Sequence, residues 1–199
     1  MAKRPSDNST RVIGAAMRLA AERGWRDLSL NDIAQAAKLP LSKVYEIYPS
    51  KRSILPGFSR MIDAQVLAEA EPAADQGESA RDRVFDVLMR RFDALQPYRE
   101  GIGAILYDLP RQPLTLCGGV RQLQRSMAWM LEAAGLSSAG PRGAVRVRGL
   151  AAVYVATLRV WLRDDSADMA KTMATLDAYL RRVESLARRL SRRRAPSEA

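Results

Sequence analysis

Residues 28–55, LSLNDIAQAAKLPLSKVYEIYPSKRSIL, decide the fold because they hold two short helix patterns around a tight turn. Ser29 and Asp32 have the spacing of a capping box, which gives the first free amides of a helix their acceptors. The apolar residues of this helix share one face: Leu30, Ile33, Ala34 and Ala37. Pro40 breaks it and suits the first turn of the next helix, which we expect from Leu41 to Tyr48. This outline is typical of a helix-turn-helix DNA-binding element.

A third helix precedes these two. Ser9 or Thr10 can cap it, and Gly24 lies where a helix should stop, so we expect it from about Arg11 to Arg23. Its apolar residues recur at helical spacing: Val12, Ile13, Ala16, Met17, Leu19 and Ala20.

The segment Tyr45-Glu46-Ile47-Tyr48-Pro49-Ser50-Lys51, with Ile33-Ala34 before it and Ile54-Leu55 after it, resembles the motif of the TetR family of one-component bacterial regulators. The resemblance covers Val12 to Leu55 and implies an N-terminal DNA-binding domain. It implies these DNA-contacting residues: Ser29, Lys43, Tyr45, Tyr48 and Lys51, with Leu41 and Ser42 on the exposed start of the recognition helix. Hydroxyl, phenol and ammonium groups all reach phosphate oxygens, which position a helix without reading sequence.

The motif departs from the family pattern at two positions, Lys38 and Pro40, and two further features bear on DNA recognition. Lys38 stands where the family usually has a turn glycine, and Pro40 where it usually has a capping serine, so we expect a turn without a freely rotating φ and a helix without a side-chain cap. Pro56 should kink a fourth helix that starts near Ser50. Residues 41–48 contain no arginine, which leaves Lys43 as their one strong base-edge donor.

The positive charge is concentrated at the two ends of the chain. Residues 1–57 hold ten Lys or Arg against five acids, residues 58–180 fifteen against fifteen, and residues 181–199 seven against two. A basic N-terminal segment on a neutral body suits phosphate binding through counterion release. The arginines from Arg181 to Arg194 either complement a helix dipole and keep the tail soluble, or contact nucleic acid or acidic lipid.

Composition limits the function classes. The chain has 199 residues, no histidine and one cysteine, Cys117, so the usual triad base, the commonest zinc ligand and an intrachain disulfide are missing. We therefore expect that the protein is not an enzyme and that it binds no metal and no cofactor. The longest apolar run, from Gly149 to Leu158, is too short for a membrane span, and the N-terminus has no apolar signal region, which predicts a soluble cytoplasmic chain.

Helical periodicity continues through the body, which predicts an all-α protein of about nine helices. After a polar break over 71–79, helices are expected up to Pro97, over 101–109 and over 120–134, the last two separated by Pro110, Pro113 and Gly118-Gly119. We expect a helix-turn-helix domain over 1–57, a helical ligand-binding and dimerisation domain over 58–190 and a basic disordered tail over 191–199.

The last two helices carry long apolar seams. The seam residues are Val147, Leu150, Tyr154, Thr157 and Trp161, then Met169, Met173, Leu176, Leu180, Val183, Ala187 and Leu190. In the arrangement that the TetR resemblance implies, these helices form a homodimer interface, and two recognition helices then demand a palindromic operator. The alternative is that both seams are buried inside the monomer. Asp164, Asp165 and Asp168, clustered around Ser166, should cap the final helix.

Methionine and aromatic residues of the middle helices are candidates for a cavity that holds a small apolar effector. The candidates are Met89, Phe92, Leu106, Leu109, Met127, Met130, Tyr154 and Trp161, with Ile105 and Trp129 beside them. The same residues can equally be plain core.

A second resemblance keeps another function open. The segment from Leu150 to Asp177 is similar to the C-terminal half of ubiquinone-biosynthesis accessory proteins, which have a TetR-like fold and bind lipid. Under this alternative the cavity holds an isoprenoid or acyl chain and the basic ends face an anionic membrane. The tyrosine-lysine motif and the N-terminal basic excess favour the regulator.

Overall fold

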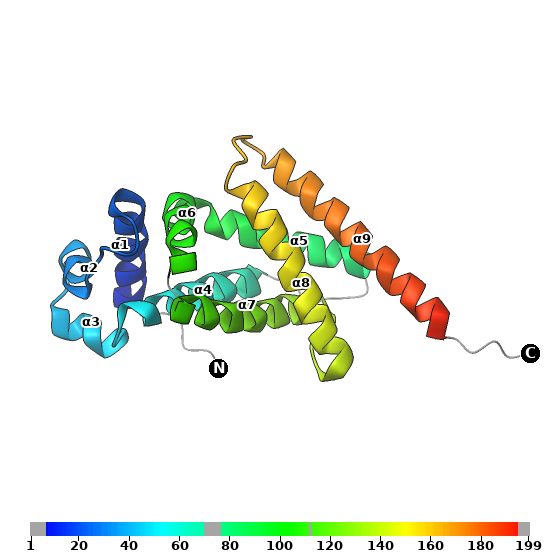
Figure 1. Cartoon of the computed structure of the whole chain (residues 1–199), viewed down its shortest axis with the longest axis horizontal. Coiled ribbons are helices and arrows are strands. Elements are labelled where there is room, and N and C mark those ends of the chain that lie inside the picture. Colours follow the sequence, from blue (N-terminus) through cyan, green and yellow to red (C-terminus); the bar gives the residue numbers. More distant parts are fainter. Residues whose placement is uncertain (1–6, 70–76, 112, 195–199) are drawn as a thin grey trace, which may run out of the picture. The chain divides into compact units, whose positions relative to one another are not determined.

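The computed structural model describes residues 7–69, 77–111 and 113–194, with side chains placed in these ranges except at 113–114 and 187–194. The regular secondary structure in these ranges is all helical (Figure 1), with no strand, which confirms the all-α class. The helices are α1 Asp7–Arg23, α2 Leu30–Ala36, α3 Leu41–Ile47, α4 Lys51–Glu69, α5 Ala80–Leu95, α6 Arg99–Asp108, α7 Pro113–Ala133, α8 Gly140–Trp161 and α9 Ala170–Arg194, with short 3-10 turns η1 Gln96–Tyr98 and η2 Leu109–Arg111.

The chain forms two compact units. The N-terminal unit comprises Met1–Glu69 and Asp93–Ser126, and the C-terminal unit comprises Ala70–Phe92 and Met127–Ala199. The domain boundary expected at residue 57 lies inside α4, and residues 191–194 of the expected tail are helical in α9; residues 195–199 lie outside the described residues. The domain limits of the sequence analysis stay predictions.

The first three helices form as their local sequence dictates. Ser29 and Asp32 make the expected capping box, with the Asp32 amide 3.1 Å from Ser29 Oγ and the Ser29 amide 2.8 Å from the Asp32 carboxylate. Gly24 stops α1 with a φ of +82°, and α3 starts at Pro40 without a side-chain cap. α1 packs against α2, α4 and α6, so it is the central helix of this unit.

The turn between α2 and α3 depends on Lys38, which has a φ of +54°. This left-handed conformation costs a non-glycine residue about 1–2 kcal/mol. Arg11 stabilises the turn from α1, because its guanidinium donates to the carbonyls of Ala37 at 2.8 Å and Lys38 at 3.2 Å. The missing glycine is therefore tolerated with the help of a side chain from another helix.

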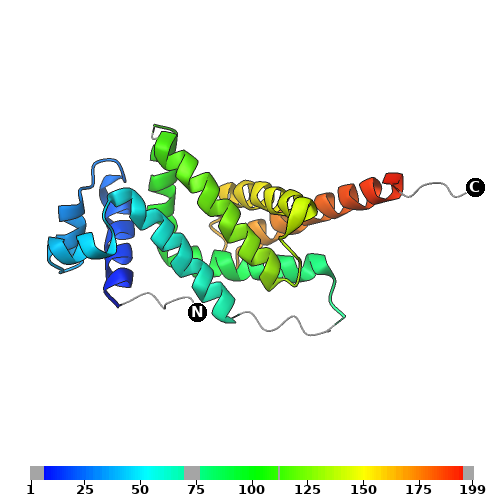
Figure 2. The same ribbon diagram turned by 90° about the horizontal axis from the view of Figure 1, so that it is seen from below.

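α4 and the first part of α7 lie side by side within the N-terminal unit (Figures 1 and 2). Two polar contacts fix their register: Ser126 Oγ donates to the buried Asp63 carboxylate, and Gln122 Nε2 lies 3.4 Å from Ser59 Oγ. α4 continues through Pro56 from Lys51 to Glu69. The kink expected at Pro56 stays a prediction.

The helix break expected at Gly118-Gly119 is wrong. α7 begins at Pro113 and continues through both glycines to Ala133. Proline suits the first turn of a helix, where its missing N–H costs nothing, and each interior glycine weakens a helix by only about 0.5–1 kcal/mol.

Aromatic rings form the core of the C-terminal unit. Phe92 stacks on Tyr154 with ring centroids 5.4 Å apart and tilts against Trp161 at 5.8 Å. α8 and α9 pack against each other, and every α8 residue of the predicted seam is buried. On α9, Leu176 and Leu180 are buried while Val183 is exposed. The seams are therefore mostly core of this unit, and Ala187 and Leu190 lie outside the described side chains.

Asp164 organises the turn between α8 and α9. Its buried carboxylate accepts from the Thr172 amide at 2.8 Å and hydroxyl at 2.6 Å, and also from the amide and hydroxyl of Ser166. Ser166 Oγ and Asp168 accept from the Ala170 amide, which confirms the expected cap of the last helix. Burial acts to raise the pKa of Asp164, but the hydrogen bonds from Ser166 and Thr172 outweigh it and hold that pKa well below its usual value.

Replacing Asp164 with asparagine should lower the free energy of unfolding by about 1.5–3 kcal/mol, because the charged acceptor of the Thr172 and Ser166 groups is lost. A carboxyl with a lowered folded pKa stabilises the fold above its unfolded pKa, near 3.9, and loses this contribution as the pH falls toward the folded value. The variant should therefore show a flatter acid limb in urea unfolding measured against pH. Asp168→Asn is the control, since asparagine also caps helices and should change stability by under about 0.5 kcal/mol. Equal losses in both variants would contradict this role.

Candidate nucleic-acid interface

The outer face of α3 presents the candidate recognition side chains. Leu41 is 48% exposed and Tyr45 64% exposed, and Ser42 and Lys43 are exposed beside them. Lys43 Nζ lies 2.7 Å from the Glu46 carboxylate. An exposed pair of this kind is worth under about 1 kcal/mol, so a phosphate or base edge can take the ammonium from it. The structure thus brings together four of the seven predicted DNA-binding residues on one exposed face.

Tyr48 lies on the inner side, where it anchors α3. Its side chain is 4% exposed, and its hydroxyl forms a 2.7 Å hydrogen bond with Ser9 of α1. Its ring rests on Gly57 of α4, where an added Cβ would come within 2.5–2.8 Å of the phenol. The structure therefore gives Tyr48 a packing role, and its ring has almost no surface left for the DNA contact that the family resemblance implies.

Lys51 is held by the loop between α1 and α2. Its ammonium donates to the carbonyls of Trp25 at 2.9 Å, Arg26 at 2.9 Å and Leu28 at 2.7 Å, and lies 5.4 Å from the centre of the Trp25 ring. We call this arrangement the Lys51 clamp. Burial lowers the pKa of Lys51, and the nearby Asp27 and Asp108 carboxylates oppose that shift. With three carbonyl partners, Lys51 fixes the start of α4 rather than offering a free charge.

Ser29, the remaining candidate, is exposed but already serves the capping box, where its hydroxyl lies 2.5 Å from the Asp32 carboxylate. This bond is the main reason why the pKa of Asp32 is lowered. A phosphate contact by Ser29 would have to coexist with the cap.

Sequence reasoning missed three residues that position this face: Arg11, Trp25 and Asp108. Asp108, at the end of α6, accepts from the Arg26 amide at 3.0 Å and so ties α6 to the loop of the Lys51 clamp. These contacts join positions that are 26 and 82 residues apart in the chain. No local pattern marks such pairs, and only the buried Trp25 could have been suspected from its residue type.

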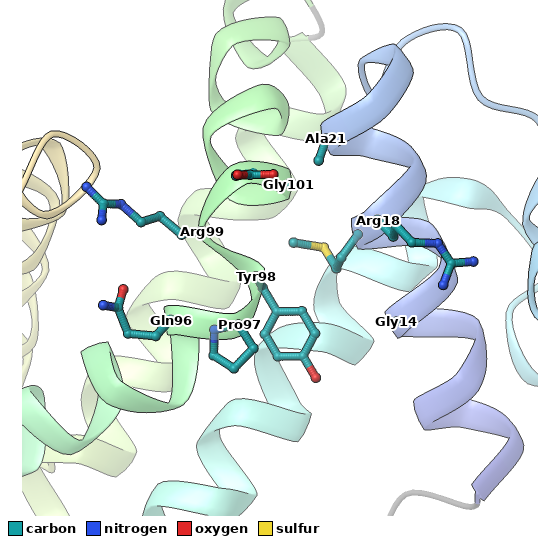
Figure 3. A pocket seen from close by; sticks show the side chains of 10 residues that line it. Gly14, Arg18, Ala21, Gln96, Pro97, Tyr98, Arg99 and Gly101 are labelled. Atoms are coloured by element: carbon teal, nitrogen blue, oxygen red, sulfur yellow. The ribbon is translucent and has the colours of Figure 1, made fainter. Parts of the chain in front are cut away.

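The contact between α1 and α6 is close enough to exclude a side chain at Gly101. A Cβ added there would come within 2.4 Å of the Met17 carbonyl oxygen. Beside this contact lies an open pocket of about 600 Å³, whose lining includes Gly14 of α1 and, facing it, Gln96, Pro97 and Tyr98 (Figure 3). No heavy atom lies within 4 Å of a Cβ added at Gly14.

The predicted effector residues fall in both units. In the C-terminal unit Phe92, Met127, Met130, Tyr154 and Trp161 are buried and Met89 is half-buried. The Phe92 ring contacts those of Tyr154 and Trp161. Leu106 and Leu109 belong to the N-terminal unit, and Trp129 is mostly exposed. Their common role in a cavity stays a prediction.

An apolar pocket of about 190 Å³ lies elsewhere in the C-terminal unit. Its lining comes from α5, α7, α8 and α9 and the turn after α7: Ala80, Arg81, Val84, Leu131, Leu136, Arg146, Leu150, Val153, Leu180, Val183 and Glu184. Sequence reasoning placed three of these, Leu150, Leu180 and Val183, in the helix seams instead. Two arginines and a glutamate border an otherwise aliphatic lining, which suits an apolar molecule with a polar end.

The family models match two separate segments. Residues 12–56 match the model "Bacterial regulatory proteins, tetR family", and residues 121–187 match the COQ9 model. Both resemblances noted in the sequence are thereby confirmed. No curated protein matches the sequence.

Solved structures match over almost the whole chain. A TetR transcriptional regulator from Nitrosomonas europaea has 23% identity and a TM-score of 0.70 over 87% of this chain and 95% of that chain. A tetR-family regulator from Streptomyces coelicolor has 20% identity and a TM-score of 0.57 over 95% and 93%. Thermus thermophilus FadR, a TetR-family repressor in complex with lauroyl-CoA, has 18% identity and a TM-score of 0.57 over 87% and 91%. This chain has the TetR fold.

Within the TetR fold of this chain, the match over 12–56 spans α1 to α3 and the first turns of α4, so it includes the exposed face, Tyr48 and the Lys51 clamp. The COQ9 match spans most of α7, α8 and much of α9. Among the described residues, no helix is both long and apolar enough to cross a membrane.

Replacing Lys51 with methionine should lower the free energy of unfolding by about 1–3 kcal/mol, because three loop carbonyls lose their donor while the aliphatic stem is kept. Lys43→Met on the exposed face is the matched control, with an expected change under about 0.5 kcal/mol. Urea unfolding of both variants measures the difference. If Lys51→Met were as stable as Lys43→Met, the clamp would not hold the start of α4.

Gly101→Ala should destabilise this TetR fold by about 1–3 kcal/mol, because the new methyl group collides with the α1 backbone at Met17. Gly14→Ala, on the facing helix, should stabilise it by about 0.5–1 kcal/mol, since the methyl meets open space and alanine favours the helix. Thermal unfolding of both variants gives the two signs. Changes of the same sign would show that the α1–α6 contact is looser than the structure indicates.

Proposed function

We propose that this protein is a TetR-type DNA-binding transcriptional regulator rather than an enzyme, and that it acts in the cytoplasm as a homodimer on a palindromic operator. The observation that carries the proposal is the outer face of α3, where Leu41, Ser42, Lys43 and Tyr45 are exposed together. The inner side of the same segment is anchored by Tyr48 and by the Lys51 clamp. A rigidly held helix with exposed polar tips is what entry into the major groove requires.

Charge supports the assignment to DNA. The first 57 residues carry twice as many basic as acidic side chains, ten against five. Tyr45 and Ser42 can bond phosphate oxygens, and Lys43, once released from Glu46, can reach a base edge. Because α3 has few base-edge donors, we expect it to contact few bases of the operator. We expect the affinity for the operator to depend strongly on salt.

The homodimer belongs to the proposal because α8 and α9 each leave large apolar side chains exposed in the monomer. Val145 on α8 is 68% exposed, and Val183 and Leu186 on α9 are 42% and 57% exposed. We propose that the dimer contact uses these exposed side chains of α8 and α9 rather than the buried seam. The proposed homodimer carries two α3 helices, one for each half-site of a palindromic operator.

Control by a small apolar ligand completes the proposal. The aliphatic pocket in the C-terminal unit offers room for part of an acyl chain, with Arg81 and Arg146 at its border. The repressor from Thermus thermophilus, which has the same fold, was solved with lauroyl-CoA. A ligand that binds the DNA-competent and incompetent dimers unequally shifts operator affinity, typically about 5- to 150-fold.

The COQ9 match favours one second function, a lipid-binding accessory protein of the ubiquinone-biosynthesis type. It would use the same C-terminal unit for an isoprenoid or acyl chain and would need no operator. The two functions differ in what the N-terminal unit does, so DNA selection separates them.

The deciding experiment selects binding sites from random duplex DNA with the full-length protein at physiological salt. Enrichment of a palindrome supports the dimeric regulator and supplies an operator for ligand screening. Salt-sensitive binding without enrichment would overturn the regulator, and mass spectrometry of co-purified lipids would then test the accessory function.

On the enriched site, Tyr45→Ala should weaken binding by roughly three- to tenfold across sequences, because it removes a phosphate contact, while Lys43→Ala should change base preference. Tyr107→Ala, which removes another exposed tyrosine, and Lys171→Ala are the matched controls and should bind like the parent protein. Fluorescence anisotropy measures all four affinities. Unchanged affinity in both α3 variants would exclude α3 as the recognition helix.

A further inference from the structure

Besides the open pocket near Gly101, the N-terminal unit has a polar groove beside the loop of the Lys51 clamp. Its lining comes from the end of α1, the loop after it, α6 and η2: Arg23, Gly24, Arg26, Asp27, Gly103, Ala104, Tyr107, Asp108 and Arg111. We call it the loop groove. It has a volume of about 660 Å³, and the small residues Gly24, Gly103 and Ala104 leave it open.

Three arginines meet at the loop groove from separate parts of the chain. Arg23 ends α1, Arg26 belongs to the loop and Arg111 ends η2, and all three are exposed. None of them forms a side-chain hydrogen bond or an ion pair with any described residue. Arg111 lies over the ring of Tyr107, 5.4 Å from its centre, and Tyr107 itself is 73% exposed. Arg23 acts on the Asp32 carboxylate only through the field. Three guanidinium groups whose N–H donors are not used by a carboxylate are a donor set for phosphate or carboxylate oxygens.

The two carboxylates of the groove do not cancel this charge. Asp108 accepts from the Arg26 amide at 3.0 Å, so one of its oxygens is directed at the loop backbone. Asp27 is exposed and opposes an anion through the field alone. Three cations against two anions, one of them already hydrogen-bonded, leave the groove with a positive excess.

The loop groove is also separate from the face proposed for DNA. Ser9, near the start of α1, bonds Tyr48 directly after α3, whereas the groove uses Arg23 and Gly24 at the other end of α1. The groove is open, with room for a compact molecule between α1 and α6.

From this convergence we propose that the loop groove is a binding site for a small phosphate-bearing anion, held by the guanidinium groups of Arg23, Arg26 and Arg111. The anion lies against Gly24 and Gly103, and the Arg26 amide stays with Asp108. This site is distinct from the aliphatic pocket of the C-terminal unit. Its main test measures anion binding alone, so failure of the anion site and failure of the proposed regulator are distinguishable.

The test is isothermal titration calorimetry of the full-length protein with inorganic pyrophosphate at low ionic strength. We expect saturable binding at one site per chain, weakened about fivefold or more in Arg111→Gln and Arg23→Gln, because each loses charge-assisted hydrogen bonds. Asp27→Asn should strengthen binding about twofold, since it removes a repulsive charge. A general loss of fold cannot weaken pyrophosphate binding in the arginine variants and strengthen it in Asp27→Asn.

Matched controls keep the result specific. Arg121→Gln removes an exposed arginine of α7 outside the groove, and Asp86→Asn removes an exposed acid of α5. Both should bind pyrophosphate like the parent protein, and circular dichroism confirms that every variant is folded.

Three outcomes overturn the proposal. The first is no saturable binding at millimolar pyrophosphate, and the second is an equal loss in Arg121→Gln, which would mean diffuse attraction to a basic chain. The third is a loss of affinity for duplex DNA in Arg111→Gln without any anion present, which would make the loop groove part of a DNA-binding surface.

Discussion

The N-terminal unit depends on one ammonium group. Lys51 Nζ meets the carbonyls of Trp25, Arg26 and Leu28, and in doing so closes the loop between α1 and α2 onto the first residue of α4. Because α3 ends only four residues before Lys51, the clamp also limits how far the recognition helix can tilt. Loop carbonyls left without donors in a half-buried place would be costly, so this one side chain satisfies what the local backbone cannot satisfy by itself.

The residues of the family motif divide into an exposed group and a buried group. Tyr45 and Tyr48 are three positions apart, yet one is mostly exposed and the other is packed on Gly57 and bonded to Ser9. Three residues turn a helix by about 300°, and the helix ends at Ile47, so the second tyrosine points back toward α1 and α4. A family motif therefore mixes residues that meet the ligand with residues that hold those in place.

Features that depend only on neighbouring residues could be predicted from the sequence. The capping box at Ser29, the glycine stop at Gly24 and the cap around Asp164 all formed where their residue types predicted. It was insufficient for contacts between distant positions, such as Arg11 with the turn at Lys38 or Asp108 with the loop at Arg26. Helical periodicity could not decide whether an apolar seam packs against its own chain or against a second copy. On α8 the seam residues are buried within the monomer. Helical spacing reports that a face is buried and carries no information on the partner.

Gly101 indicates how the two parts of the N-terminal unit could communicate. Its missing side chain lets α6 approach the α1 backbone at Met17, and the same helix ends at Asp108, which holds the loop of the Lys51 clamp. α6 thus touches α1 along its length and the loop at its tip. A displacement of α6 cannot leave the clamp unaffected, because close packing at Gly101 and a charge-assisted hydrogen bond at Arg26 both resist separation. A ligand that moves α6 therefore acts on α1 at Met17 and, through the Asp108 carboxylate, on the loop that Lys51 holds at the start of α4.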